Sequence, residues 1–114
     1  MSLLTHQAEY SQDEKIKEIS DYYGYEAQSR QLIEEMAELT QAINKLWRIN
    51  KGYKLADPTI KKMYFDNVIE EIADVEVCLS YVKTALDIKS EQIDRVKSYK
   101  VDREIQRIAT NKEQ

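Results

Sequence analysis

Apolar residues recur every three or four positions in two central stretches of the chain. Within residues 26–50 they are Leu32, Met36, Leu39, Ile43 and Leu46. Within residues 57–86 they are Phe65, Val68, Ile72, Val75, Leu79, Val82 and Leu86. This spacing is typical of helices that carry one apolar stripe. Because a short link joins the two stretches, we predict an antiparallel helix pair packed stripe against stripe.

Capping residues add a helix before this pair. Ser11 with Glu14 three residues later forms a capping box. Gly24 can adopt the positive φ of a left-handed C-cap. We therefore expect one helix up to Gly24 and a second over 26–50.

Two more helix starts follow in the second half of the chain. Asp57 before Pro58 is a typical N-cap followed by proline at the first helical position. Ser90 is expected to cap a last helix that ends near Ile108. The sequence thus predicts a flexible tail at 1–10, one four-helix all-α domain at 11–108, and a frayed tail at 109–114.

Composition supports a small helical domain that associates with further copies. The chain has 114 residues, of which 33% are charged, with two Gly and one Pro. A domain of this size buries only part of its surface. Apolar residues outside the two stripes indicate a subunit interface, and hence a homodimer or tetramer. They are Ile33, Trp47, Ile69, Val77 and Tyr81.

Charge and cysteine content narrow the class of protein. The net charge of −4 disfavours binding to a nucleic acid polymer. Cys78 is the only cysteine, which rules out an intramolecular disulfide framework. No apolar run approaches the roughly 18 residues of a membrane span. We expect a cytoplasmic protein without a membrane partner.

One acidic motif occurs twice. The stretch LIEEMAEL at 32–39 is followed thirty-six positions later by VIEEIADV at 68–75. This offset equals ten turns at 3.6 residues per turn, so the two copies have matching orientations on their helices. In an antiparallel pair their equivalent flanks lie on the same side. The acids expected to converge there are Glu35, Glu38, Glu71 and Asp74.

Convergent carboxylates repel one another unless a cation neutralises them. No Lys or Arg lies near these acids on the same flank of either helix. Oxygen ligands without Cys or His suit Mg²⁺, with Mn²⁺ as the alternative. A carboxylate-bridged iron site is disfavoured because the only histidine is His6 in the tail. Acidic pairs on amphipathic helices can also form a solvated face, which is our interpretation of Glu34 and Glu70.

The motifs resemble a known family. EEMAE at 34–38 and EIAD at 71–74 are similar to the signature of the MazG-like all-α nucleoside triphosphate pyrophosphohydrolases, and the likeness extends over about 22–107. The resemblance implies a helical oligomer that uses Mg²⁺ to hydrolyse a nucleoside triphosphate to the monophosphate and pyrophosphate. It also implies that Glu35, Glu38, Glu71 and Asp74 are the metal ligands. The chain departs from the family at Lys100 and Val101, where a Lys-Asn pair is frequent.

Other residues are candidates for catalysis and for substrate binding. Glu35 or Glu38 is the expected proton acceptor. Lys97, Lys100 and Arg103 share one arc of the last helix and suit phosphate oxygens, although the helix dipole alone also favours cations there. Gln28 is a candidate for contact with a base edge. The alternatives are a hydrolase restricted to dUTP or dCTP, and a helical oligomerisation or adaptor module without enzymatic activity.

Overall fold

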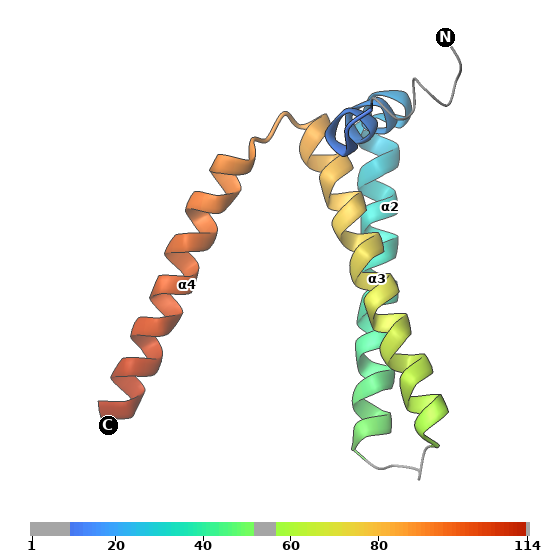
Figure 1. The fold of residues 1–114 in the computed structure, drawn as a ribbon. Coiled ribbons are helices and arrows are strands. Elements are labelled where there is room, and N and C mark those ends of the chain that lie inside the picture. The colour runs from blue at the N-terminus through green and yellow to red at the C-terminus, as the bar shows by residue number, and fades with distance from the viewer. Residues whose placement is uncertain (1–9, 52–56, 114) are drawn as a thin grey trace.

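The computed structural model describes residues 10–51 and 57–113, and most of these residues are helical (Figure 1). The helices are α2 (Gln12–Asn50), α3 (Pro58–Ala85) and α4 (Ser90–Glu113). The described residues contain no strand. The all-α class is confirmed. Of the expected N-terminal tail at 1–10, only residue 10 is among the described residues.

The first two predicted caps are confirmed by hydrogen bonds. The Ser11 hydroxyl oxygen accepts from the Glu14 backbone N–H at 3.1 Å. The Asp57 carboxylate accepts from the Thr59 backbone N–H at 2.7 Å. Each bond satisfies a backbone donor that has no partner within the first turn of a helix.

Helix α4 begins and ends differently from the prediction. Ser90 is the first helical residue rather than the cap. The cap position belongs to Lys89, whose backbone N–H donates to the Gln92 side-chain oxygen at 2.8 Å. The helix continues to Glu113, beyond the expected end near Ile108. Its last turns contain no Gly or Pro that would stop it.

Gly24 breaks the regular geometry of α2. Its φ of 82° and ψ of 169° are not helical, so α2 is two helical segments joined at a kink. A left-handed cap has ψ near 47°, and the observed ψ instead turns the chain sharply. The first segment therefore crosses the C-terminal end of α3 (Figure 1). There the Ser20 hydroxyl donates to the Tyr81 carbonyl oxygen at 2.8 Å.

The rest of α2 lies antiparallel beside α3, as predicted, and forms a helical hairpin (Figure 1). The core of the contact is small. It consists of Leu32, Val75 and Cys78, with Leu39 and Val82 packed against them. Ala42 is also buried, with 2% of its surface exposed. The smaller side chains among them, such as Ala42 and Cys78, let the two backbones approach closely.

The predicted stripes are only half correct. On α3 the contact uses Val68, Val75 and Val82, here called the inner column. The remaining residues of that stripe are exposed and form the outer column. The outer column is Phe65, Ile72, Leu79 and Leu86. On α2, Leu32, Leu39 and Leu46 are at least partly buried, whereas Met36 and Ile43 are exposed.

Helix α4 projects away from the hairpin (Figure 1). Asp87 has a φ of 56°, and the Ile88 N–H donates to the Lys83 carbonyl oxygen at 2.9 Å. These features form a Schellman motif, which ends α3 and sets the direction of α4. Among the described residues α4 packs against neither other helix and buries none of its side chains, so one chain does not form the expected four-helix bundle there. None of the helices in the described ranges is long and apolar enough to cross a membrane.

Candidate metal centre

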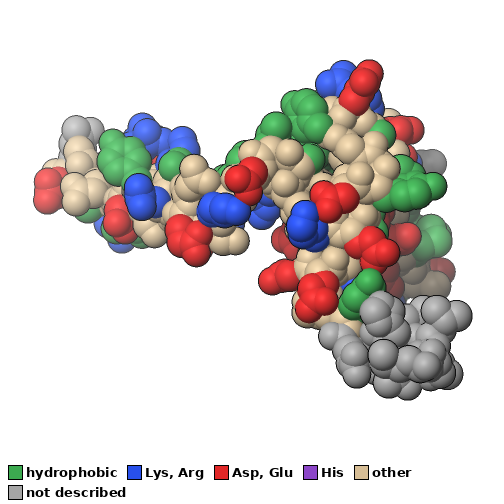
Figure 2. Space-filling view, turned by 90° about the horizontal axis from the view of Figure 1, so that it is seen from above, with side chains coloured by type: hydrophobic (Ala, Val, Ile, Leu, Met, Phe, Trp, Pro, Cys, Tyr) green, Lys and Arg blue, Asp and Glu red, His purple; other side chains and the backbone are tan. Residues whose placement is uncertain are grey.

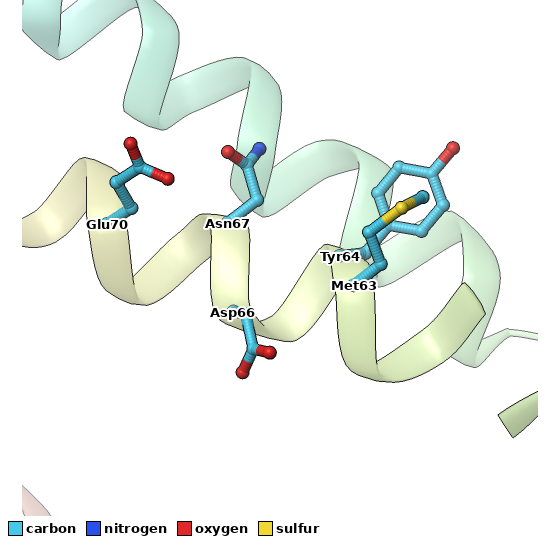
Figure 3. A pocket seen from close by; sticks show the side chains of 5 residues that line it. All are labelled: Met63, Tyr64, Asp66, Asn67 and Glu70. Atoms are coloured by element: carbon cyan, nitrogen blue, oxygen red, sulfur yellow. The ribbon is translucent and has the colours of Figure 1, made fainter. Parts of the chain in front are cut away.

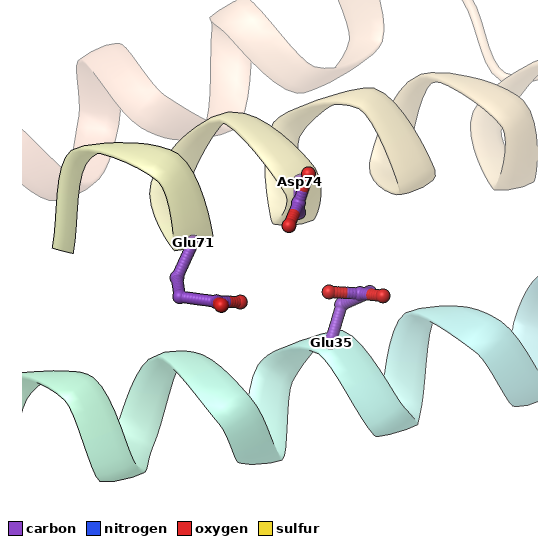
Figure 4. Close-up of side chains that lie close together, drawn as sticks. All are labelled: Glu35, Glu71 and Asp74. Atoms are coloured by element: carbon purple, nitrogen blue, oxygen red, sulfur yellow. The ribbon is translucent and has the colours of Figure 1, made fainter. Parts of the chain in front are cut away.

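Three carboxylates meet between the two helices of the hairpin. Glu35 comes from α2, and Glu71 and Asp74 come from α3. Each offers one oxygen, and the three oxygens all lie within 4.8 Å of one another. The side chains point toward each other across the gap between the helices (Figure 4). The doubled motif therefore brings its acids together, as the sequence predicted for these three residues.

Two oxygens of this cluster lack partners. The Oε2 atoms of Glu35 and Glu71 are buried and make no hydrogen bond with a described residue. Glu35 Oε1 accepts from the Gln31 side-chain amide at 2.8 Å. No ion pair among the described residues includes Glu35, Glu71 or Asp74. Buried carboxylate oxygens need a donor or a cation, and here neighbouring side chains supply one donor only.

Burial and electrostatic repulsion at the cluster raise the pKa of two carboxyl groups. The pKa of Glu71 is raised by burial, and the charges of Asp74 and Glu35 add to the shift. The pKa of Glu38 is raised chiefly by the charge of Glu35. Both shifts indicate that negative charge is unfavourable here without a counter-ion.

Glu38 lies beside the cluster rather than within it. It was expected as a fourth ligand, but its oxygens are not among the three that converge. It is exposed, although close enough to feel the charges of Glu35 and Glu71. Glu34 and Glu70 are exposed, in agreement with the outward orientation expected for them. The four-acid set is therefore divided into three convergent carboxylates and one at the edge.

The cause of this division is the rotation of each helix about its axis. The sequence analysis placed all four acids beside the apolar contact. In the structure the contact runs along the inner column, so Glu35 and Glu71 lie in the contact itself and are partly buried. Glu38, about 60° further round α2 than Glu35, remains at the solvent edge.

The arrangement fits a hard divalent cation. Carboxylate oxygens are the ligands that Mg²⁺ and Mn²⁺ prefer, and Mg²⁺ commonly takes only a few carboxylates and completes its shell with water or phosphate oxygens. The side chains of Glu35 and Glu71, each with one buried oxygen that lacks a partner, point into this position (Figure 4). Glu35, Glu71 and Asp74 are thus the residues that can hold such an ion.

A hollow of about 410 Å³ lies at the inner corner of the Gly24 kink. Gln28 and Gln31 line it from α2, and Cys78 and Tyr81 line it from α3. Of these four residues, only Gln28 was expected from the sequence as a site residue. The signal was present, because Gln31 precedes Glu35 by four residues and Cys78 follows Asp74 by four, which is about one helical turn in each case.

A second hollow, of about 370 Å³, is lined by a single helix (Figure 3). Its lining consists of Met63, Tyr64, Asp66, Asn67 and Glu70. All five belong to α3, so no second element encloses the space. It offers a surface depression rather than a site between helices.

The cationic arc proposed for phosphate binding lies on α4. Lys97, Lys100 and Arg103 are exposed there, and the Arg103 guanidinium lies 5.7 Å from the centre of the Tyr99 ring. Acidic and basic side chains are mixed along this helix (Figure 2). Since α4 packs against neither described helix of the hairpin, the structure does not bring these cations to the acidic cluster.

Comparison with known proteins gives no relative: no protein-family model, curated protein or solved structure matches this chain.

Proposed function

We propose that this chain is a Mg²⁺-dependent pyrophosphohydrolase that converts a nucleoside triphosphate to the monophosphate and pyrophosphate. The observation that carries the proposal is the pair of buried, unpartnered oxygens on Glu35 and Glu71, directed into a cluster with Asp74. Such oxygens are costly unless a cation neutralises them. The order and spacing of the acids, which resemble the MazG-like signature, link that cation to a triphosphate substrate.

The acids divide into two roles in this proposal. Glu35, Glu71 and Asp74 hold the cation. When bound, Mg²⁺ supplies positive charge that offsets the charge of the triphosphate. Glu38 accepts the proton of the attacking water, because it is exposed beside the cluster and its raised pKa brings it nearer to the pH of the reaction. Glu35 is the poorer base, since Gln31 already donates to one of its oxygens.

The proposed enzyme is a homodimer or tetramer. Its outer column on α3 is an exposed apolar row, and such rows are typical of protein contacts. An oligomer would also explain how cations on α4 reach a triphosphate. Lys97, Lys100 and Arg103 cannot do so within the described hairpin, so they act on the cluster of another copy.

The same outer column favours a second candidate, which is an oligomerisation module without enzymatic activity. In that case the acids are a surface feature and Mg²⁺ has no specific effect. The two candidates differ in whether the protein responds to Mg²⁺ through Glu71 and Asp74.

The decisive experiment combines pyrophosphate release with thermal melts. A panel of nucleoside triphosphates with Mg²⁺ should yield pyrophosphate, and Glu71→Gln or Asp74→Asn should lower the rate by orders of magnitude. Mg²⁺ at about 100 times its Kd should stabilise the folded protein by about 2.7 kcal/mol, and these variants should lose that gain. Glu34→Gln, on an exposed position of α2, is the matched control and should retain both properties. Equal Mg²⁺ responses in Glu34→Gln and Glu71→Gln would refute the proposal.

A further inference from the structure

Gln31 lies on α2 about one turn before Glu35, and its side-chain amide donates to Glu35 Oε1 at 2.8 Å. Residues four apart on a helix are neighbours on its surface, so the local geometry of α2 favours this bond. Gln31 is exposed and does not belong to the core of the hairpin. Its hydrogen bond is therefore directed at the acidic cluster rather than at the packing between the helices.

This bond gives the two oxygens of Glu35 different environments. Oε1 accepts from Gln31, whereas Oε2 is buried and has no partner among the described residues. The carboxylate lies between the two helices, where one of its oxygens is within 4.8 Å of oxygens of Glu71 and Asp74 (Figure 4). A carboxylate held through one oxygen keeps its orientation, so Oε2 is the oxygen that Glu35 offers to a cation.

Repulsion within the cluster explains why Glu35 needs such a restraint. The charges of Glu35 and Asp74 add to the burial that raises the pKa of Glu71. An unrestrained Glu35 side chain would turn toward water, because like charges separate where the backbone allows it. A neutral amide donor holds the carboxylate in place without cancelling the negative charge that attracts a cation. Gln31 has this property, whereas a lysine or arginine donor does not.

Mg²⁺ and Ca²⁺ make different demands on a carboxylate ligand. Ca²⁺ takes about six to eight oxygens, often both oxygens of one carboxylate, in a flexible geometry. Mg²⁺ takes about six oxygens in a stricter octahedral geometry and keeps several water molecules. Because Gln31 occupies Oε1, Glu35 can offer one oxygen only. This arrangement suits Mg²⁺ and hinders the two-oxygen binding mode of Ca²⁺.

We propose that Gln31 is a positioning residue that restricts Glu35 to one ligating oxygen and thereby makes the acidic cluster select Mg²⁺ over Ca²⁺. The inference rests on the proposed function for the presence of a cation at the cluster. It deepens that function, because it assigns the choice of cation to a residue that is not itself a ligand.

Calorimetric titrations of the metal-free protein with MgCl₂ and with CaCl₂, both without nucleotide, test this inference. The natural protein should bind Mg²⁺ more tightly than Ca²⁺. Gln31→Met preserves the length of the side chain but removes the donor, and it should weaken Mg²⁺ binding about tenfold. Ca²⁺ binding should weaken less, because Oε1 becomes available to it. The ratio of the Ca²⁺ Kd to the Mg²⁺ Kd should therefore fall severalfold, whereas a merely structural role of Gln31 would change both constants equally.

Two further variants serve as controls. Gln41→Met, at another exposed position of α2, should leave both dissociation constants unchanged. Gln31→Lys keeps a donor at the same position, so it should retain the preference for Mg²⁺ although its charge weakens the binding of both cations. Circular dichroism should show that all three variants are as helical as the natural protein, because both positions are exposed.

The outcomes separate this inference from the hydrolytic function. An unchanged or raised ratio in Gln31→Met overturns the inference, even if the natural protein hydrolyses triphosphates with Mg²⁺. A ratio lowered equally in Gln31→Lys also overturns it, because the donor would then be irrelevant. So does a natural protein that binds neither cation or prefers Ca²⁺. A ratio lowered in Gln31→Met and retained in Gln31→Lys supports the inference, even if no triphosphate is hydrolysed and the proposed function fails.

Discussion

The inner and outer columns of α3 are both apolar and share one periodicity, but they lie in different environments. Val75 in the inner column is buried against Leu32 and Cys78. In the outer column, Phe65 is 54% exposed and Leu79 is 39% exposed. Both columns repeat every seven residues, so both look equally suited to a helix partner. The difference teaches that an apolar stripe identifies a surface that needs covering without saying which neighbour covers it.

Side-chain size explains which column packs inside the hairpin. Val75 and Val82 of the inner column pack with Leu32 and Leu39 of α2, and the small residues Ser29 and Ala42 are also buried on that helix. The larger Phe, Ile and Leu of the outer column would hold the helix axes further apart. Close approach along the inner column is also what places Glu35 against Glu71, so core packing and the acidic cluster have the same origin.

The largest effect is expected from a cavity in the inner contact. Leu32→Ala should lower the free energy of unfolding by about 2–5 kcal/mol, because it removes a buried side chain from the centre of the core. Urea denaturation followed by circular dichroism measures this. Ile105→Ala on α4, where the side chain is 62% exposed, should change the value by less than about 0.5 kcal/mol. Comparable losses in both variants would show that α4 packs as tightly as the hairpin.

A change in the outer column should act on association rather than on folding. Phe65→Gln combined with Leu79→Gln should convert an oligomer of at least twice 13.4 kDa into a monomer, as measured by light scattering at micromolar concentration. Circular dichroism should remain helical. The KM for a triphosphate should rise severalfold if α4 cations reach the cluster of another copy.

The matched control for this variant is a pair of apolar residues on α4 that are more exposed still. Val101→Gln with Ile105→Gln removes two such side chains and should leave the mass unchanged. A natural protein that scatters as a monomer would contradict the assignment of the outer column as an interface.

The smallest effect is a pH dependence of the Mg²⁺ response. The folded-state pKa of Glu71 and of Glu38 is raised above its usual value near 4.5, so the folded protein binds more protons than the unfolded chain just above that pH. The contribution of these two carboxyl groups to the free energy of unfolding of the metal-free protein therefore falls as the pH rises through the raised pKa. Mg²⁺ competes with protons for these carboxylates, so the increase in the protein's Tm that Mg²⁺ produces should be larger at pH 7 than at pH 5.

Melts of the natural protein and of Glu71→Gln at the two pH values test this. The variant should lose most of the pH dependence of the Mg²⁺ gain, whereas Glu34→Gln should retain it. A gain that is the same at pH 5 and pH 7 in the natural protein would mean that Mg²⁺ does not displace protons from the cluster.

Much of the architecture was predictable because it depends on local signals. The caps at Ser11 and Asp57 and the break at Gly24 follow from backbone hydrogen bonding and from the conformations available to glycine. The matching of the two acidic motifs follows from the helical period alone. These features do not depend on which helices pack against each other.

The sequence by itself determined that four helical segments form, two of them joined at Gly24, and that Glu35 and Glu71, like Glu38 and Asp74, have equivalent places on two of these segments. Only the tertiary structure decided that the inner column makes the contact, which brings those three acids together and leaves Glu38 at the edge. It also decided that Gln28 is buried in a hollow at the kink. The reason is that helical period is a property of the local backbone, whereas the rotation of a helix about its axis depends on side-chain sizes across the contact.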